Sequence, residues 1–187
     1  MIFALAWLGL ALLLYYYLGM GSYKFLDTDN IIEKATKMKI TEIFASEGED
    51  GFRDVESQVL DTVHSYVRCV ISTGGGLVCK TNNWAKLQTG IVIWLDVSPE
   101  LIYERIRHEA ADRPLLQTED PLQTLTDLLD ERTAKYTQAD VRVEITDPTM
   151  DEDSVVSKIV YDLHNHIDEN PPAWKIAKQR DDEQQQS

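Results

Sequence analysis

The chain has 187 residues, 43% of them hydrophobic, which suits one compact domain with a substantial core. The 32 acidic residues outnumber the 18 basic ones, and the formal net charge of −14 excludes a broad nucleic-acid surface, because phosphate binding requires clustered cations. Cys69 and Cys79 have neither C-x-x-C nor zinc-site spacing, so we expect reduced thiols in a reducing compartment.

The first part of the chain differs from the rest. Residues 2–20 carry no charge and reach the lower end of the length that crosses a bilayer as a helix. A secretory signal fits poorly, because a basic beginning and a cleavage motif are both absent. Two interpretations of residues 1–21 stay open: a membrane anchor formed by residues 2–20, or a start that is not native to the domain.

From residue 22 to residue 169, predicted strands and helices alternate. Strands are expected at 23–27, 67–71, 91–95 and 141–145, and helices at 30–39, 41–47, 50–66, from Ser98-Pro99-Glu100 onward, at 121–135 and around 155–163. Such alternation predicts an α/β fold with a parallel sheet between helical layers. Residues 170–187, which begin near a Pro-Pro pair and end in acids and glutamines, are predicted to be disordered.

A glycine loop follows one of the predicted strands. Ser72-Thr73-Gly74-Gly75-Gly76 comes directly after the apolar residues 67–71. Three adjacent glycines lack every Cβ, so a ligand can take hydrogen bonds from the backbone N–H groups. Loops at the carboxyl ends of parallel strands are common ligand sites, which favours a binding loop over a plain flexible turn.

Several motifs occur together in a fixed order. They are Phe25-Leu26-Asp27-Thr28-Asp29, Gly48-Glu49 with Phe52-Arg53 and Glu56, Ser72-Thr73-Gly74-Gly75-Gly76, Trp94-Leu95-Asp96, Arg113-Pro114-Leu115-Leu116, and Arg132 with Tyr136. In its order and its residue identities, this series of motifs resembles shikimate kinase over roughly residues 23–163. The resemblance implies a three-layer α/β/α fold of the nucleoside-monophosphate-kinase-like P-loop type with a five-stranded parallel sheet. It also implies Mg²⁺-dependent transfer of the γ-phosphoryl group of ATP to the 3-hydroxyl of shikimate.

The resemblance assigns roles around the substrate. Asp29 would accept hydrogen bonds from shikimate hydroxyls and orient or deprotonate the attacking oxygen, although it could also cap the following helix. Arg53 and Arg132 would clamp the shikimate carboxylate, since a planar guanidinium matches two oxygens at once, and surface ion pairs are the alternative for each. Glu56 lies one turn from Arg53 and could hold it in position. Gly74, Gly75 and Gly76 would lie close to the shikimate ring.

Further residues are assigned to the nucleotide and the metal. Asp27 and Ser72 resemble indirect Mg²⁺ ligands that reach the ion through water. Arg113 lies in what resembles a mobile lid spanning roughly residues 107–121, and together with Arg107 it would contact ATP and offset charge that develops during transfer. An exposed loop arginine is the alternative for Arg113.

The phosphate-binding motif of the family is not found in this sequence. A P-loop reads Gly, four residues, then Gly-Lys-Ser/Thr, and the chain contains no Gly-Lys dipeptide. Residues 18–22 resemble the start of such a loop, but too few residues separate them from the strand at 23–27 for a parallel crossover. We therefore expect the first strand and the P-loop to be missing or displaced, with a gap or altered pairing in the sheet.

Three functional hypotheses follow. The first is a shikimate kinase whose P-loop segment is missing from this version, and the second is a non-catalytic protein that binds shikimate or a partner protein. The third is a membrane-tethered protein anchored by residues 2–20. By resemblance alone, we expect a monomer in a plastid or the cytoplasm.

Overall fold

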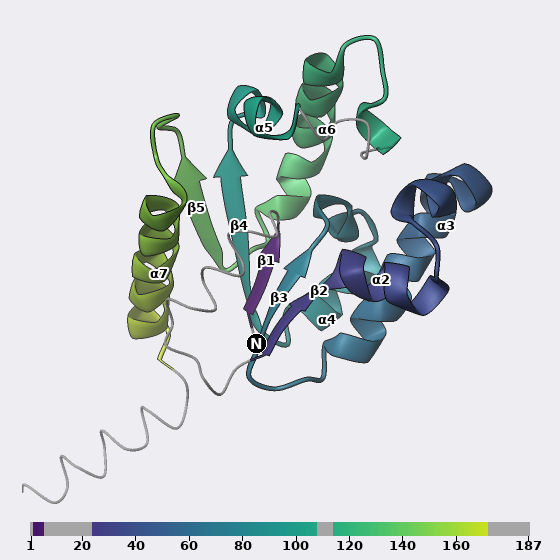
Figure 1. The fold of residues 1–187 in the computed structure, drawn as a ribbon. Helices are drawn as coiled ribbons and strands as arrows, with labels where there is room; N and C mark the ends of the chain where they lie inside the picture. Colours follow the sequence, from purple (N-terminus) through teal and green to yellow (C-terminus); the bar gives the residue numbers. More distant parts are fainter. Residues whose placement is uncertain (1, 6–23, 108–113, 172–187) are drawn as a thin grey trace, which may run out of the picture.

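The computed structural model describes residues 2–5, 24–107 and 114–171, which form a parallel sheet between helices (Figure 1). In chain order the elements are β1 Ile2–Leu5, β2 Lys24–Asp27, α2 Thr28–Thr36, α3 Ile40–Val63, β3 Cys69–Thr73, the 3₁₀ turns η1 Gly75–Cys79 and η2 Thr81–Asn83, α4 Trp84–Leu87, β4 Ile91–Val97, α5 Pro99–Ile106, η4 Pro114–Leu116, α6 Pro121–Tyr136, β5 Val141–Ile145 and α7 Glu152–Glu169. The alternation of strands and helices and the α/β class predicted from the sequence are confirmed.

The sheet has five parallel strands in the order β2-β3-β1-β4-β5. Its central strand is β1, in which Ile2 pairs with Val70 on one side and Ile91 on the other. The expected gap or altered pairing is therefore wrong. The sequence-based interpretation looked for the strand close to residue 18, whereas the sheet uses the beginning of the apolar run. Residues 6–23 then exceed the dozen or so residues that a parallel crossover requires.

The predicted anchor also needs correction. Residues 2–5 form a strand within the sheet, so they are not part of a membrane-spanning helix over residues 2–20. Across the described ranges, no helix is both long and apolar enough to span a bilayer. The remainder of the anchor prediction, the P-loop-like residues 18–22 and most of the predicted C-terminal tail lie outside the described residues.

Two hydrophobic clusters cover opposite faces of the sheet. Alternate residues of a strand point to opposite faces, so Trp94 of β4 packs with α6 while Leu95 packs with α7. The last strand, β5, is buried and exposed in strict alternation, as its sequence predicts. Helices α2, α3, α4 and α6 contribute to one cluster and α7 to the other, which gives the three layers visible in Figure 1. Both cysteines are free thiols; Cys69 is buried and Cys79 is half-buried.

Helix α3 combines the two helices predicted at 41–47 and 50–66, with a break at Gly48. The backbone there has φ 71° and ψ −175°, a conformation that is essentially restricted to glycine. The break separates a short first segment from the longer second segment, whose first residue is Glu49. The position and direction of the second segment therefore depend on a glycine at residue 48.

We expect Gly48→Ala to lower the free energy of unfolding by roughly 1–3 kcal/mol, because a Cβ is strained at this φ and ψ. Nothing within 4 Å would clash with that Cβ, so the cost comes from backbone strain rather than from overlap. Urea unfolding followed by circular dichroism measures the change. Glu47→Ala, at the neighbouring exposed position, is the control and should change stability by less than about 0.5 kcal/mol. An unchanged urea midpoint for Gly48→Ala would show that the break does not require glycine.

Candidate active site

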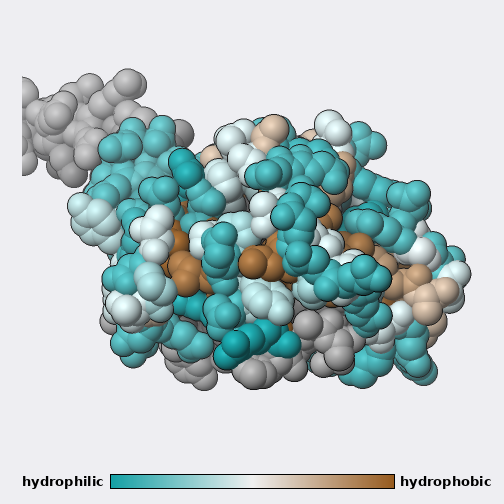
Figure 2. Space-filling model, turned by 90° about the horizontal axis from the view of Figure 1, so that it is seen from above, coloured by the Kyte–Doolittle hydropathy of each residue, from teal (hydrophilic) through white to brown (hydrophobic). Residues whose placement is uncertain are grey.

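The polar residues singled out in the sequence gather where the parallel strands end. Figure 2 looks onto this end of the molecule, where a few hydrophobic residues lie in the middle of a largely hydrophilic face. The glycine loop begins at the end of β3, α2 begins at the end of β2, and the second segment of α3 passes close to both. Four elements contribute to the site, because α6 adds a tyrosine and an arginine.

Arg53 lies at the centre of the site and is only 6% exposed. Its Nη1 donates to Glu56 Oε2 at 2.5 Å, and its Nη2 and Nε donate to Glu49 Oε1 at 2.8 Å and 3.3 Å. Both carboxylates lie on the same helix face, four residues before and three residues after the arginine. Arg53 is therefore a buried cation between two anions, and the surface ion pair considered from the sequence is wrong.

Arg132 reaches the same place from α6. It is 9% exposed, and its Nη2 lies 3.7 Å from Glu49 Oε1, the oxygen that also contacts Arg53. In the described part of the chain, its Nε is buried without a hydrogen-bond partner. Two guanidiniums from distant parts of the sequence thus face one carboxylate, which is the arrangement that binds a carboxylate ligand.

The glycine loop packs directly against these side chains. A Cβ on Gly74 would lie 2.9 Å from Glu56 Oε1, and one on Gly76 would overlap the guanidinium of Arg53. The carbonyl of Gly75 accepts a hydrogen bond of 2.8 Å from the hydroxyl of Tyr136, which fixes the loop to α6. The close approach of Glu56, Tyr136 and Arg53 therefore explains the run of glycines.

Glu56 has the most perturbed environment in the site. Its pKa is raised to about 7: burial is the main cause, Arg53 and Arg132 act in the opposite direction, and the neighbouring Asp29 carboxylate adds to the rise. The side chain is only 2% exposed. A carboxyl group that titrates near neutral pH therefore lies against both Asp29 and the glycine loop.

The two aspartates of the first motif have different local roles. Asp27 is the N-cap of α2, and its Oδ1 accepts a hydrogen bond of 2.7 Å from the Asn30 N–H. Asp29 lies in the first turn of α2, where a Cβ on Gly74 would be 3.7 Å from its Oδ1. The N-cap alternative for Asp29 is therefore wrong, because the helix begins two residues earlier than predicted. Asp29 is left facing the glycine loop.

The predicted metal ligands lie at the same strand ends. Asp27 and Ser72 are register partners on β2 and β3, and Ser72 is 3% exposed. Next to Ser72, the Thr73 hydroxyl is buried with no hydrogen-bond partner among the described residues, and Thr73 pairs with Leu5 of the central strand. These oxygens suit a hydrated hard cation such as Mg²⁺. No cluster of three or more acidic, histidine or cysteine side chains that could hold a metal directly occurs in the described ranges.

Of the two arginines predicted to contact ATP, the structure describes only Arg107, which does not join this cluster. Arg107 caps the end of α5, is half exposed, and pairs with Glu104 of its own helix at 3.2 Å. Arg113 lies outside the described residues. Contact of Arg107 and Arg113 with ATP therefore stays a prediction.

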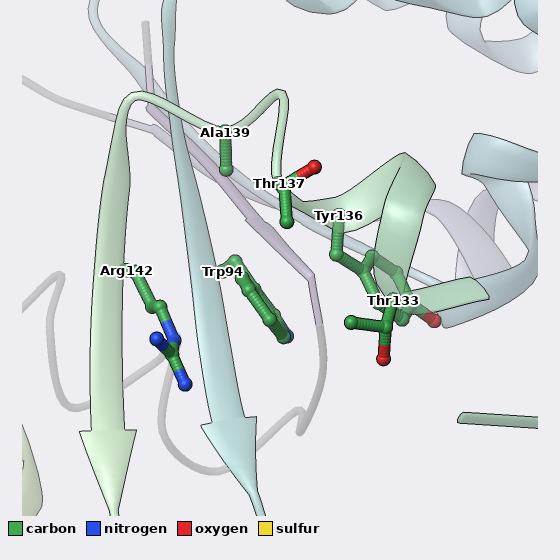
Figure 3. A pocket seen from close by; sticks show the side chains of 6 residues that line it. All are labelled: Trp94, Thr133, Tyr136, Thr137, Ala139 and Arg142. Atoms are coloured by element: carbon green, nitrogen blue, oxygen red, sulfur yellow. The ribbon is translucent and has the colours of Figure 1, made fainter. Parts of the chain in front are cut away.

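A separate hollow of about 250 Å³ lies between β4, β5 and α6 (Figure 3). Trp94 lies between the guanidinium of Arg142, 5.1 Å from a Trp94 ring centroid, and the ring of Tyr136, at a centroid distance of 5.6 Å. Tyr136 also donates a hydrogen bond to the carbonyl of Gly75. The stacked side chains therefore support the glycine loop from the side of α6.

The sequence interpretation gave little or no role to three residues of this site. Glu49 and Tyr136 were part of the motifs but received no role, and Glu56 was considered only as a support for Arg53. Helical spacing could have identified them, because Glu49 and Glu56 flank Arg53 on one face and Tyr136 follows Arg132 by one turn.

Comparisons with known proteins agree with this geometry. A sequence model described as shikimate kinase matches residues 20–164. A shikimate kinase of Synechococcus elongatus is 47% identical over 153 residues, which cover 80% of this chain and 80% of the relative. A shikimate kinase of Trichormus variabilis is 50% identical over 121 residues, which cover 65% of this chain and 66% of the relative.

Solved structures show the same likeness. The shikimate kinase of Acinetobacter baumannii in complex with shikimate superposes with a TM-score of 0.76 at 34% identity, covering 85% of this chain and 89% of that one. The shikimate kinase of Bacteroides thetaiotaomicron superposes with a TM-score of 0.74 at 28% identity, covering 87% and 97%. The strand order and the site at the strand ends define a small-molecule kinase of the three-layer, P-loop type. Within that class, the chain belongs to the shikimate kinase family, a family of phosphotransferases.

Glu56 should make stability depend on pH. Its folded pKa of about 7 lies above the ordinary value of 4.5, so the folded state retains a proton that the unfolded chain has already lost. The contribution is therefore fully present below about pH 4.5 and is lost as the pH rises through 7. Relative to Glu56→Gln, the wild type should lose up to about 3 kcal/mol of unfolding free energy between pH 4.5 and pH 8. Urea unfolding of both proteins across this range measures the difference, and two parallel curves would contradict the assignment.

Proposed function

We propose that this protein binds shikimate at the ends of β2 and β3 and phosphorylates its 3-hydroxyl with ATP. The observation that carries the proposal is the pair of buried arginines, Arg53 and Arg132, that face one carboxylate position beside a glycine loop. Both guanidiniums direct donors at one shared carboxylate position, and a planar guanidinium matches the two oxygens of a carboxylate better than a neutral group. Shikimate supplies a carboxylate together with ring hydroxyls.

The ring hydroxyls would be read by Asp29. Its carboxylate lies next to the glycine loop and acts on Glu56 electrostatically, so it belongs to the same cluster. A carboxylate within hydrogen-bond reach of a hydroxyl can orient it and take its proton as the bond to phosphorus forms. We assign this role to Asp29, with Glu56 and Tyr136 holding Arg53 and the loop in place.

ATP and Mg²⁺ would bind beside the same loop, with the ion at the ends of β2 and β3. Asp27 and Ser72 are suited to hold the ion through water, and Arg107 and Arg113 are assigned to the nucleotide. When bound, Mg²⁺ neutralises phosphate oxygens during transfer. Positioning and charge stabilisation supply most of the catalysis of phosphoryl transfer, so these residues would act by orientation.

A second candidate function is favoured by one observation: the sequence contains no Gly-Lys dipeptide. The lysine of that motif neutralises β and γ phosphate oxygens in P-loop kinases. A chain without it could keep the shikimate site and act as a non-catalytic binding protein.

Replacing either site arginine should weaken shikimate binding. We expect Arg132→Lys and Arg53→Lys to raise the Kd roughly tenfold to a hundredfold, because lysine cannot form the planar two-point contact. Isothermal titration calorimetry measures this change. Arg68→Lys is the matched control, since Arg68 is exposed and precedes β3, at the opposite end of that strand from the glycine loop. Equal affinity for all four proteins would contradict the carboxylate clamp.

An assay that couples ADP release to shikimate addition separates the two candidate functions. Shikimate-dependent turnover supports the kinase, and we expect Asp29→Asn to reduce it by about 10²–10⁴-fold while shikimate affinity changes far less. Shikimate binding in the calorimeter without ADP release supports the non-catalytic function instead. Turnover that survives Asp29→Asn would remove the assigned role of Asp29.

A further inference from the structure

Glu49 holds a position in the site that a ligand carboxylate would also need. A guanidinium has a limited set of donors in a fixed plane, and in Arg53 the Nη1 side is occupied by Glu56 at 2.5 Å. The other edge, Nε and Nη2, donates to a single oxygen of Glu49. The same oxygen lies 3.7 Å from Arg132 Nη2. One carboxylate of the protein itself therefore bridges the two cations.

The two acidic partners of Arg53 differ in how easily they can leave. The Glu56 side chain is 2% exposed and lies against the glycine loop, whereas the Glu49 side chain is 44% exposed. Displaced from the arginines, Glu49 can be hydrated with little rearrangement. It is also the first residue after the backbone break at Gly48, so it can move without unwinding the second segment of α3.

Charge balance also favours an exchange. Glu49 already neutralises the edge that Arg53 and Arg132 share, and Asp29 and the partly protonated Glu56 lie beside it. Adding a ligand carboxylate while all three acids stay in place would bring another negative charge into a largely buried site, which is costly. Exchanging Glu49 for the ligand carboxylate leaves the charge around Arg53 and Arg132 unchanged.

We propose that Glu49 is an internal competitor for the carboxylate site: it pairs with Arg53 and Arg132 in the ligand-free protein and is displaced by the carboxylate of the substrate. This inference rests on the proposed function, because it takes the two arginines as the substrate clamp. Glu49 then keeps the buried arginines paired when the site is empty. It also lowers substrate affinity, because every binding event must first break its contacts.

The test is shikimate calorimetry on the full chain and its Glu49→Gln variant. We expect Glu49→Gln to bind shikimate about threefold to tenfold more tightly, in keeping with the modest strength of a half-exposed ion pair. Asp50→Asn removes the same charge one residue away, at an exposed position, and should change the Kd less than about twofold. The gain for Glu49→Gln should persist at about 0.5 M salt, where the Debye length is about 4 Å and remote charges are screened.

A shikimate analogue with a primary alcohol in place of the carboxylate separates competition from a general effect on the pocket. It should bind no more tightly to Glu49→Gln than to the wild type, since it does not require the edge of Arg53 that Glu49 occupies. If Glu49→Gln fails to fold, Glu49→Asp carries the test. Its shorter side chain keeps the charge but bridges the two arginines less well, so a smaller gain of the same sign is expected.

The possible failures are distinguishable. If the wild type binds shikimate and a folded Glu49→Gln binds it equally or more weakly, or if Asp50→Asn gains as much, the competition by Glu49 is overturned while the proposed function stands. If neither the wild type nor Glu49→Gln binds shikimate, the proposed function fails and this inference fails with it.

Discussion

The site is organised around the burial of one guanidinium. A charge as deeply buried as that of Arg53 is costly unless anions surround it, and α3 supplies a carboxylate one turn before it and one turn after it. The same guanidinium occupies the space of a side chain at Gly76, so the loop beside it must be bare. Sharing Glu49 with Arg132 then ties α6 to α3. The arrangement of the site is therefore largely a consequence of keeping this cation paired.

The overall charge of the protein and the charge of its site have different consequences. A formal charge of −14 predicts repulsion of anions, yet the family acts on an anionic acid and an anionic nucleotide. At physiological ionic strength the Debye length is about 8 Å, so exposed acids farther away are largely screened. Arg53 and Arg132 act at contact distance in a buried setting, where their attraction for a carboxylate is much stronger. Local placement of two cations therefore outweighs the net charge.

The first strand shows where sequence interpretation failed. Residues 2–20 are uniformly apolar, so neither periodicity nor turn residues indicate which four of them enter the sheet. The strand next to β3 and β4 is chosen by backbone pairing on both sides and by the chain length needed to reach β2. Both conditions involve residues distant in sequence. A similar uncertainty at a helix boundary placed the possible N-cap at Asp29, whereas the helix is capped by Asp27, two positions earlier.

Local patterns were enough to predict most strands and helices, the glycine loop and the residue types of the site, because hydrophobic period, helix caps and motif spacing act over a few residues. The resemblance to shikimate kinase, and not these local patterns, implied that Asp29, Arg53, the glycines and Arg132 belong together. The contacts that make this group a site were decided by packing: Glu49 between two arginines from different helices, Tyr136 on the carbonyl of Gly75, and the burial that raises the pKa of Glu56. These contacts join segments far apart in the chain, so their distances and burial exist only once the helices have packed on the sheet.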